Sequence, residues 1–166
     1  LLAWVPEAGG TVAAAVATAQ ALVAALLMNV AIVGVNQVYD VEIDRINKPY
    51  LPLASGEMSM AGAVRTVVVT AALSLAMGVA SLSLPLLATL GGSLALGLAY
   101  STDLPGLRWK RSPAVAAACI MAVRSFAVHV GFFAHVRLAQ GLEFAWTPAL
   151  GFAVAFMLLF SIVIAF

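Results

Sequence analysis

Long apolar runs alternate with short polar segments along the chain. Four regions are apolar over about a membrane thickness or more, namely residues 11–35, 66–102, 112–134 and 147–166. Crossing a bilayer as a helix takes about 20 apolar residues, so the second region has room for two helices. Ser81–Pro85 is the expected turn between them, because Pro interrupts an established helix. Backbone in lipid must satisfy its own hydrogen bonds, so the pattern predicts an all-α, polytopic transmembrane bundle of five helices.

The composition agrees with this pattern and excludes a soluble domain. Hydrophobic residues make up 64% of the 166 and charged residues only 9%. A soluble domain is nearer half apolar, because it needs a charged surface. The net charge of +1 gives no basis for nucleic-acid binding, so the predicted partner of the surface is the lipid bilayer. The single Cys119 lies in an apolar run and is expected to be a buried, inert thiol.

The basic residues gather in two of the loops. Arg45, Lys48 and Arg65 flank the loop after the first apolar run, and the loop before residue 112 holds Arg108, Lys110 and Arg111. Two helices separate these loops, so both are expected on the same side of the membrane. The excess of Lys and Arg marks that side as cytoplasmic or its organellar equivalent.

Acidic residues also concentrate at one point. The stretch NQVYDVEIDRINKPYLPLASGE, residues 36–57, holds four of the chain's seven acidic residues. Asn36, Asp40 and Asp44 are spaced by four, and residues at i and i+4 share one face of a helix. Pro49 disfavours helix at the residue before it, so the helix should end near Lys48. The polar stripe therefore lies at the end of a membrane helix.

Two carboxylates and an amide on one face form an oxygen-rich site of the kind that Mg²⁺ prefers. Mg²⁺ commonly takes one or two carboxylates and completes its shell with water and substrate phosphates. The nearby basic residues are candidates for the remaining phosphate oxygens: Arg45, Lys48, Arg108, Lys110 and Arg111. The predicted ligand has a diphosphate head and a long hydrocarbon tail. The alternative is a solvated helix end with Asp and Arg paired at the interface.

The string from residue 36 resembles the first aspartate-rich motif, N-x-x-x-D-x-x-x-D, of the UbiA-type intramembrane prenyltransferases. The extension NKPYLPLASGE is similar to the plant and algal homogentisate prenyltransferases of vitamin E synthesis. YSTDLPGLRWKRS, residues 100–112, resembles their second loop, and AVRSFAVHVGFFAH, residues 122–135, the helix that follows it. The similarity extends from about Asn29 to the end of the chain.

The resemblance implies a fold and a set of site residues. The chain would supply about five helices of a larger bundle of about nine. Asn36, Asp40 and Asp44 would be the catalytic metal ligands, and the nearest matches to the diphosphate-binding residues are Tyr100, Arg108 and Lys110. The family's second aspartate-rich motif begins with a Lys-Asp pair and is expected beyond Phe166. Residues 1–166 are thus expected to be a partial prenyltransferase domain, inactive by itself.

The reaction implied by the resemblance is Mg²⁺-dependent transfer of a phytyl or geranylgeranyl group from its diphosphate to homogentisate. The ring would lose its carboxyl group as CO₂, in tocopherol or tocotrienol synthesis at the plastid inner envelope membrane. Another UbiA-type enzyme, with a quinone, chlorophyll or haem intermediate as acceptor, is the first alternative. An ion-coupled transporter is the remote one; it predicts an internal repeat, and none is visible in the sequence.

Several polar residues lie inside the apolar runs. A charge at mid-span costs at least about 2.5 kcal/mol on insertion scales, so Arg124 should face a polar interior. It could contact the acceptor's carboxylate or the diphosphate, or it could make a structural pair with another helix. His129 is a second candidate for an acidic aromatic acceptor, whereas His135 is expected to be solvated near the interface. Asn29 could extend the polar cavity inward from Asn36.

Overall fold

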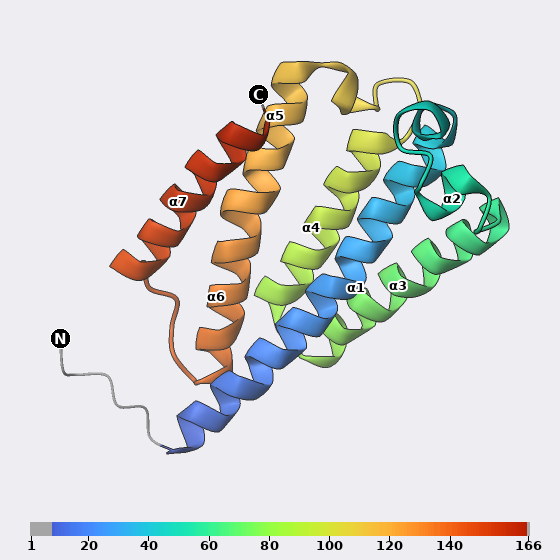
Figure 1. Cartoon of the computed structure of the whole chain (residues 1–166). Coiled ribbons are helices and arrows are strands. Elements are labelled where there is room, and N and C mark those ends of the chain that lie inside the picture. Colours follow the sequence, from blue (N-terminus) through green and yellow to red (C-terminus); the bar gives the residue numbers. More distant parts are fainter. Residues whose placement is uncertain (1–7, 166) are drawn as a thin grey trace.

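The computed structural model describes residues 8–165, which are helical without a strand among them (Figure 1). The elements in chain order are α1 (Ala8–Asn47), α2 (Pro52–Ser55), α3 (Met60–Ala80), α4 (Leu84–Ser101), the 3₁₀ turn η1 (Trp109–Arg111), α5 (Pro113–Met121), the π-helical segment η2 (Ala122–Ala127), α6 (Val128–Ala139) and α7 (Pro148–Ala165). The all-α prediction is confirmed.

Four helical stretches are long and apolar enough to cross a membrane. They are Gly10–Asn47, Met60–Ala80, Leu84–Ser101 and Pro113–Ala139. The fifth predicted span is a helix at the expected place, and its apolar part, Pro148–Val163, is shorter than the other four. The predicted turn between the second and third spans is also present, because α3 ends at Ala80 and α4 begins at Leu84, with the Ser83 hydroxyl accepting from the Leu86 amide.

Helix α1 is much longer than a bilayer crossing requires. Its 40 residues extend about 60 Å, twice the thickness of a hydrocarbon core of about 30 Å. The helix runs unbroken through the aspartate motif and ends at Asn47, two residues before Pro49, as the sequence predicted. The motif therefore sits on a rigid helical extension and not on a loop.

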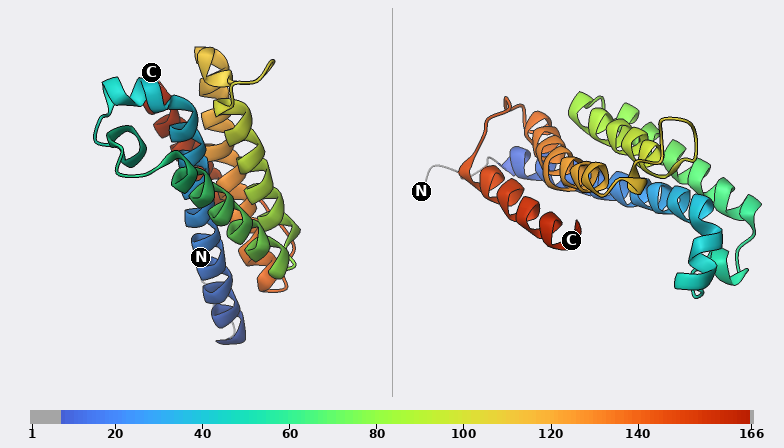
Figure 2. Two further views of the ribbon diagram at one scale, coloured as in Figure 1. Left: turned by 90° about the vertical axis from the view of Figure 1, so that its right-hand side faces the viewer. Right: turned by 90° about the horizontal axis from the view of Figure 1, so that it is seen from above.

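Helix α1 is also the axis of the bundle, since it packs against α3, α4 and α6 (Figures 1 and 2). Its buried side chains are mostly alanines, and they meet two leucines of α4 in a small core of Ala21, Ala24, Met28, Ala31, Leu86 and Leu90. Small residues let helix backbones approach closely in a membrane, where the hydrophobic effect does not drive helix association. The Ser74 hydroxyl of α3 adds a buried hydrogen bond to the Ala24 carbonyl at 2.7 Å.

The two basic loops meet at one end of the bundle. Figure 1 shows the end of α1, α2, the start of α3 and the loop after α4 gathered at the upper right. Lys110 of the second loop pairs with Asp40 of the first motif, which confirms that both loops lie on the same side. The turn between α3 and α4 lies at the opposite end.

The predicted helix over residues 112–134 differs from expectation in two ways. It continues to Ala139, and it is interrupted by the π-helical segment η2. A π-turn inserts an extra residue into the helical ladder and rotates the side chains that follow. Arg124 lies inside this segment, and Ser125 beside it is buried against α7, where its hydroxyl lies 3.0 Å from that of Ser161.

Candidate active site

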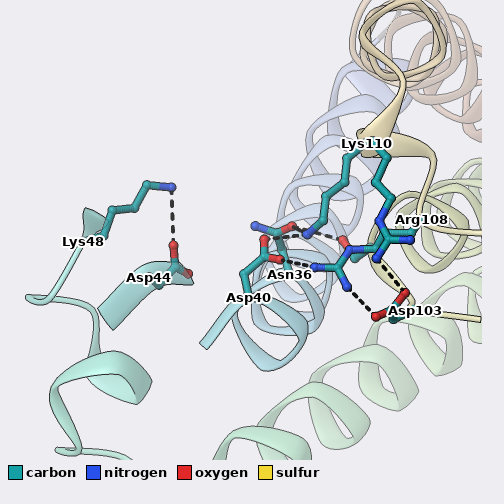
Figure 3. A network of polar contacts seen from close by, with 9 residues as sticks. Asn36, Asp40, Asp44, Lys48, Asp103, Arg108 and Lys110 are labelled. Atoms are coloured by element: carbon teal, nitrogen blue, oxygen red, sulfur yellow. Dashed lines mark hydrogen bonds and ion pairs between the residues drawn. The ribbon is translucent and has the colours of Figure 1, made fainter. Parts of the chain in front are cut away.

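A compact cluster of charged groups forms where the loop after α4 meets α1. The Lys110 ammonium donates to Asp40 Oδ2 at 2.5 Å and to Asn36 Oδ1 at 3.0 Å. The Arg108 guanidinium lies 3.5 Å from Asp40 Oδ1. Figure 3 shows both basic side chains reaching from the loop toward the face of α1 that carries Asn36 and Asp40. Sequence reasoning placed all four residues in the site, and the structure brings them together.

The loop is held in place by contacts of its own. Ser101, the last residue of α4, donates to Asn36 Oδ1 at 3.1 Å, which ties the start of the loop to α1. Arg108 has a φ of +60°, a left-handed conformation that residues with a Cβ rarely adopt. Asp103 stabilises this turn by pairing with Arg108 at 2.6 Å and with Arg111 at 3.3 Å. These contacts aim the Arg108 side chain at Asp40.

The cluster is largely shielded from solvent. The side chains of Asp40, Lys110 and Arg108 are 14%, 15% and 13% exposed. The predicted alternative was a solvated pair of an acidic residue and an Arg at the end of the helix. Such a pair is present, but it is formed by Glu42 and Arg45, which lie on another face of α1 and are 78% and 57% exposed. Arg45 was a candidate diphosphate ligand, and the structure places it with Glu42, away from Asp40.

Asp44 lies apart from the Asp40 cluster. Its carboxylate is buried and lies 3.9 Å from the Lys48 ammonium, the next candidate along the helix. Figure 3 shows this pair separated from Asp40 and Arg108. Each step of four residues turns about 40° around a helix, so the stripe drifts as it advances. No group of three or more His, Cys, Asp or Glu side chains in the described part of the chain is arranged to hold a metal by itself.

Two cavities lie beneath the charged end, between α1, α4 and the α5–η2–α6 helix. The one nearer the cluster has a volume of about 450 Å³ and is lined by Tyr100, Arg124, Asn29, Ser93 and Cys119 among apolar side chains. The other, of about 280 Å³, is almost wholly apolar and shares Asn29 and Ser93 with the first. Tyr100 therefore faces the cavity below the cluster. Cys119 is a half-buried free thiol.

The two histidines differ in their surroundings. The prediction for His135 is wrong: its side chain is buried, and Nε2 lies 3.2 Å from the Ala17 carbonyl of α1. The reason is that α1 extends along α6 and covers the end that the sequence suggested was solvated. His129 Nδ1 lies 3.1 Å from the carbonyl of Arg124 within its own helix.

Sequence reasoning missed Ser101 and Asp103 as parts of the site. Ser101 was one hydroxyl at the end of an apolar run, with no partner visible in the sequence. Asp103 precedes Arg108 by five residues, a weak signal for a pair across a turn. Both contacts depend on the path of the loop, which the amino-acid pattern does not specify.

The sequence also matches a known protein family. The model of the UbiA prenyltransferase family matches residues 3–166, almost the whole chain. The chain belongs to the UbiA prenyltransferase family. No solved structure matches it significantly.

Among curated UbiA relatives, the chain is similar to proteins named for homogentisate. It is 53% identical to the probable homogentisate phytyltransferase 1, chloroplastic, of Oryza sativa subsp. japonica, over 88% of the chain and 36% of that protein. It is 50% identical to homogentisate phytyltransferase 1, chloroplastic, of Arabidopsis thaliana and to homogentisate geranylgeranyltransferase of Hordeum vulgare, covering 37% and 36% of them. The chain thus spans about a third of the length of these relatives.

The residues of the cluster fit a divalent cation bound together with a phosphate. Asp40 Oδ1 is buried and has no hydrogen-bond partner among the residues that the structure describes, because Arg108 approaches it only at ion-pair distance. With Asn36 Oδ1 beside it, the site offers oxygen donors of the type that Mg²⁺ takes. Arg108 and Lys110 supply positive charge for phosphate oxygens. A single available carboxylate is enough where a substrate phosphate completes the shell.

Proposed function

We propose that the protein transfers a prenyl group, phytyl or geranylgeranyl, from its diphosphate to homogentisate in a Mg²⁺-dependent reaction. The observation that carries the proposal is the largely shielded cluster of Asn36, Asp40, Arg108 and Lys110 at the mouth of apolar cavities. It combines cation ligands and phosphate ligands above space for a hydrocarbon. Relatives about 50% identical carry names for this reaction.

The chain's own residues have separate roles in this proposal. Asp40 and Asn36 hold the diphosphate's metal, and Arg108 and Lys110 contact its oxygens. Lys110 contacts both Asp40 and Asn36, so it lies where metal and phosphate would meet. Asp44 and Lys48 extend the polar stripe toward the end of α1 and are proposed to join the site when substrate is bound.

The reaction requires charge stabilisation and exclusion of water. Bound Mg²⁺ neutralises negative charge on the leaving diphosphate. Arg108 and Lys110 add fixed positive charge at the same position, in a site that is largely shielded from solvent. The mostly apolar linings of the two cavities below the cluster keep water from the allylic carbon while the electron-rich ring attacks it. The allylic C–O bond breaks as the new C–C bond forms, and the attacked ring carbon gives up its proton. Loss of the side-chain carboxyl group as CO₂, with a proton taking its place, completes the proposed reaction.

The same proposal places the protein in tocopherol or tocotrienol synthesis in a plastid membrane. Two of the relatives named above are chloroplastic, and the four long apolar helices suit an integral membrane protein. The phytyltransferases named above are 53% and 50% identical to the chain and the geranylgeranyltransferase is 50% identical, so sequence identity does not separate the two donors and the assay decides between them.

The test uses the protein as its gene encodes it, in membranes with Mg²⁺ and radiolabelled homogentisate. Phytyl and geranylgeranyl diphosphate are offered separately. A prenylated, decarboxylated quinol that disappears with EDTA is the expected product, and the ratio of rates identifies the donor. Absence of product with either donor, from protein shown to be folded and to retain labelled homogentisate, would refute the proposed reaction.

A further inference from the structure

Arg124 carries a charge inside a membrane-length helix and has no acidic partner among residues 8–165. It lies 11 residues after Pro113, about 16 Å along the helix from its start. No ion pair or side-chain hydrogen bond joins it to any residue in the part of the chain that the structure describes. Its guanidinium lies over the Phe160 ring of α7, 5.9 Å from the ring centroid. A structural pair with another helix was the alternative for this residue, and residues 8–165 do not supply one.

Arg124 is one of the residues that line the cavity of about 450 Å³ beneath the charged cluster. This volume lies within the range of about 300–1,000 Å³ typical of small-molecule sites. Tyr100, Asn29 and Ser93 add polar atoms to a lining that is otherwise apolar. Such a lining suits an aromatic ring that carries a few polar substituents. A guanidinium at the edge of this cavity suits a carboxylate, whose planar oxygens match its two parallel N–H groups.

The cavity is close to the cluster but separate from it. Asn29 lines the cavity, and it lies seven residues before Asn36, about 10 Å along α1. Arg108 and Lys110 are already gathered at Asp40, above this level. A diphosphate held there therefore does not need Arg124, whereas an acceptor lying below it, beside the allylic carbon, would meet Arg124 directly.

Arg124 lies within the π-helical segment of its helix. The segment runs from Ala122 to Ala127, and the amide of Val128 bonds to the carbonyl of Val123, five residues back. At its end, His129 Nδ1 contacts the Arg124 carbonyl at 3.1 Å. A carbonyl oxygen only accepts, so Nδ1 carries the proton and donates it. The imidazole thus caps the carbonyl of Arg124 and fixes the local turn.

We infer that Arg124 binds the carboxylate of the aromatic acceptor in this cavity, and that His129 is a positioning residue that holds the π-turn from which Arg124 projects. The inference rests on the proposed function, since it assigns one substrate of that reaction to a subsite. In this arrangement each substrate has its own basic residues: the diphosphate of the donor binds at Arg108 and Lys110, and the carboxylate of the acceptor binds at Arg124.

The test measures equilibrium binding of radiolabelled homogentisate to membranes without any donor. Arg124→Gln is expected to weaken binding by about 10- to 100-fold, the loss typical of a charge-assisted hydrogen bond, with the KM for prenyl diphosphate changed less than about 3-fold. Arg124→Lys should lose less, because it keeps the charge. Arg137→Gln is the matched control: Arg137 also lies 5.9 Å from a ring, that of Phe133, but does not line the cavity.

His129 is tested by the same measurement. His129→Ala should weaken homogentisate binding by about 3- to 10-fold through Arg124, and His129→Asn, whose amide can donate to the same carbonyl, should restore most of it. If His129 had only a general structural role, His129→Ala would also raise the KM for the prenyl diphosphate.

The outcomes separate the two proposals. Wild-type protein that does not bind homogentisate contradicts the proposed function itself. Wild-type protein that binds it, with Arg124→Gln binding within about 2-fold, overturns only the subsite. If Arg124→Gln raises the KM for the prenyl diphosphate and leaves homogentisate binding unchanged, Arg124 belongs to the diphosphate site, and the acceptor subsite is also overturned. Should Arg124→Gln fail to fold, Arg124→Lys decides, because unchanged homogentisate binding in that variant contradicts the bidentate contact.

Discussion

The Lys110 ammonium lies 2.5 Å from the Asp40 carboxylate, although the two residues are 70 positions apart. The contact joins the loop after α4 to the end of α1, and Asn36 shares it at 3.0 Å. In this structure the Asp40 carboxylate, which is proposed to hold a metal cation, is therefore already paired with the Lys110 ammonium. In the proposed reaction, Lys110 must share Asp40 with the metal or move onto the diphosphate.

Asp40→Asn should reduce prenyl transfer at least about 100-fold, the scale on which removing one preorganised electrostatic group slows other enzymes. The amide keeps the shape of the side chain and removes the charge that holds both the cation and Lys110. Initial rates at saturating Mg²⁺ measure the effect. Glu42→Gln is the control, because Glu42 is exposed and pairs only with Arg45, and it should retain the wild-type rate. A fully active Asp40→Asn enzyme would remove the proposed metal site.

Asp44→Asn tests whether the second carboxylate joins the site during turnover. Asp44 is buried and lies beside Lys48, not beside Asp40. If both carboxylates hold the substrate's metal ions, the variant should need more Mg²⁺ for half-maximal rate, by about 10-fold or more. A Mg²⁺ titration of initial rate makes the measurement. An unchanged Mg²⁺ dependence, with normal rates, would limit Asp44 to its pair with Lys48.

Lys110→Ala should raise the KM for the prenyl diphosphate by about 10-fold or lower turnover, because one charged contact to the phosphate oxygens is lost. Lys110→Arg keeps the charge and should retain more activity. Arg111→Ala is the control from the same loop, because the Arg111 side chain is exposed and, among the described residues, forms its ion pair with Asp103. Steady-state rates over a range of donor concentrations compare the variants. Equal curves for Lys110→Ala and wild type would take Lys110 out of the site.

The helices and the polar stripe could be predicted from the sequence because both depend on local pattern. Apolar runs of membrane length specify spans. A spacing of four puts Asn36 and Asp40 on one face whatever the rest of the fold does. The position of Pro49 sets the end of α1 for the same local reason. The two basic loops were predicted to lie on the same side of the membrane because two helices separate them along the chain.

The rest of the site depends on contacts between distant segments. Nothing in the local pattern shows that Asp40 faces Lys110 while Asp44 faces Lys48, because that depends on where the loop after α4 crosses α1. His135 was misjudged for a related reason: its burial comes from α1, more than 100 residues earlier in the chain. The π-turn at Arg124 changes which way a side chain points, and a regular helical pattern does not reveal it.

A close contact between α4 and α6 gives a test of the fold that is independent of the reaction. A Cβ placed on Gly131 would lie 1.7 Å from Thr89 Oγ1 and 2.9 Å from its Cβ. The Thr89 hydroxyl is held by a 2.8 Å hydrogen bond to the Pro85 carbonyl, so turning it away breaks that bond. Ala would favour an exposed helix position over Gly by up to about 1 kcal/mol, but overpacking here costs about 1–3 kcal/mol and should win.

Gly131→Ala is therefore expected to lower the thermal unfolding midpoint in detergent. Gly92→Ala is the control, since a Cβ there meets no atom within 4 Å, and it should leave the midpoint unchanged or raise it. Adding Thr89→Ala to Gly131→Ala removes the nearest atom but keeps the Thr89 Cβ, so it should restore part of the loss. If Gly131→Ala is as stable as wild type, α4 and α6 do not pack as closely as the structure has them. If the second substitution deepens the loss, the clash is not with the Thr89 hydroxyl.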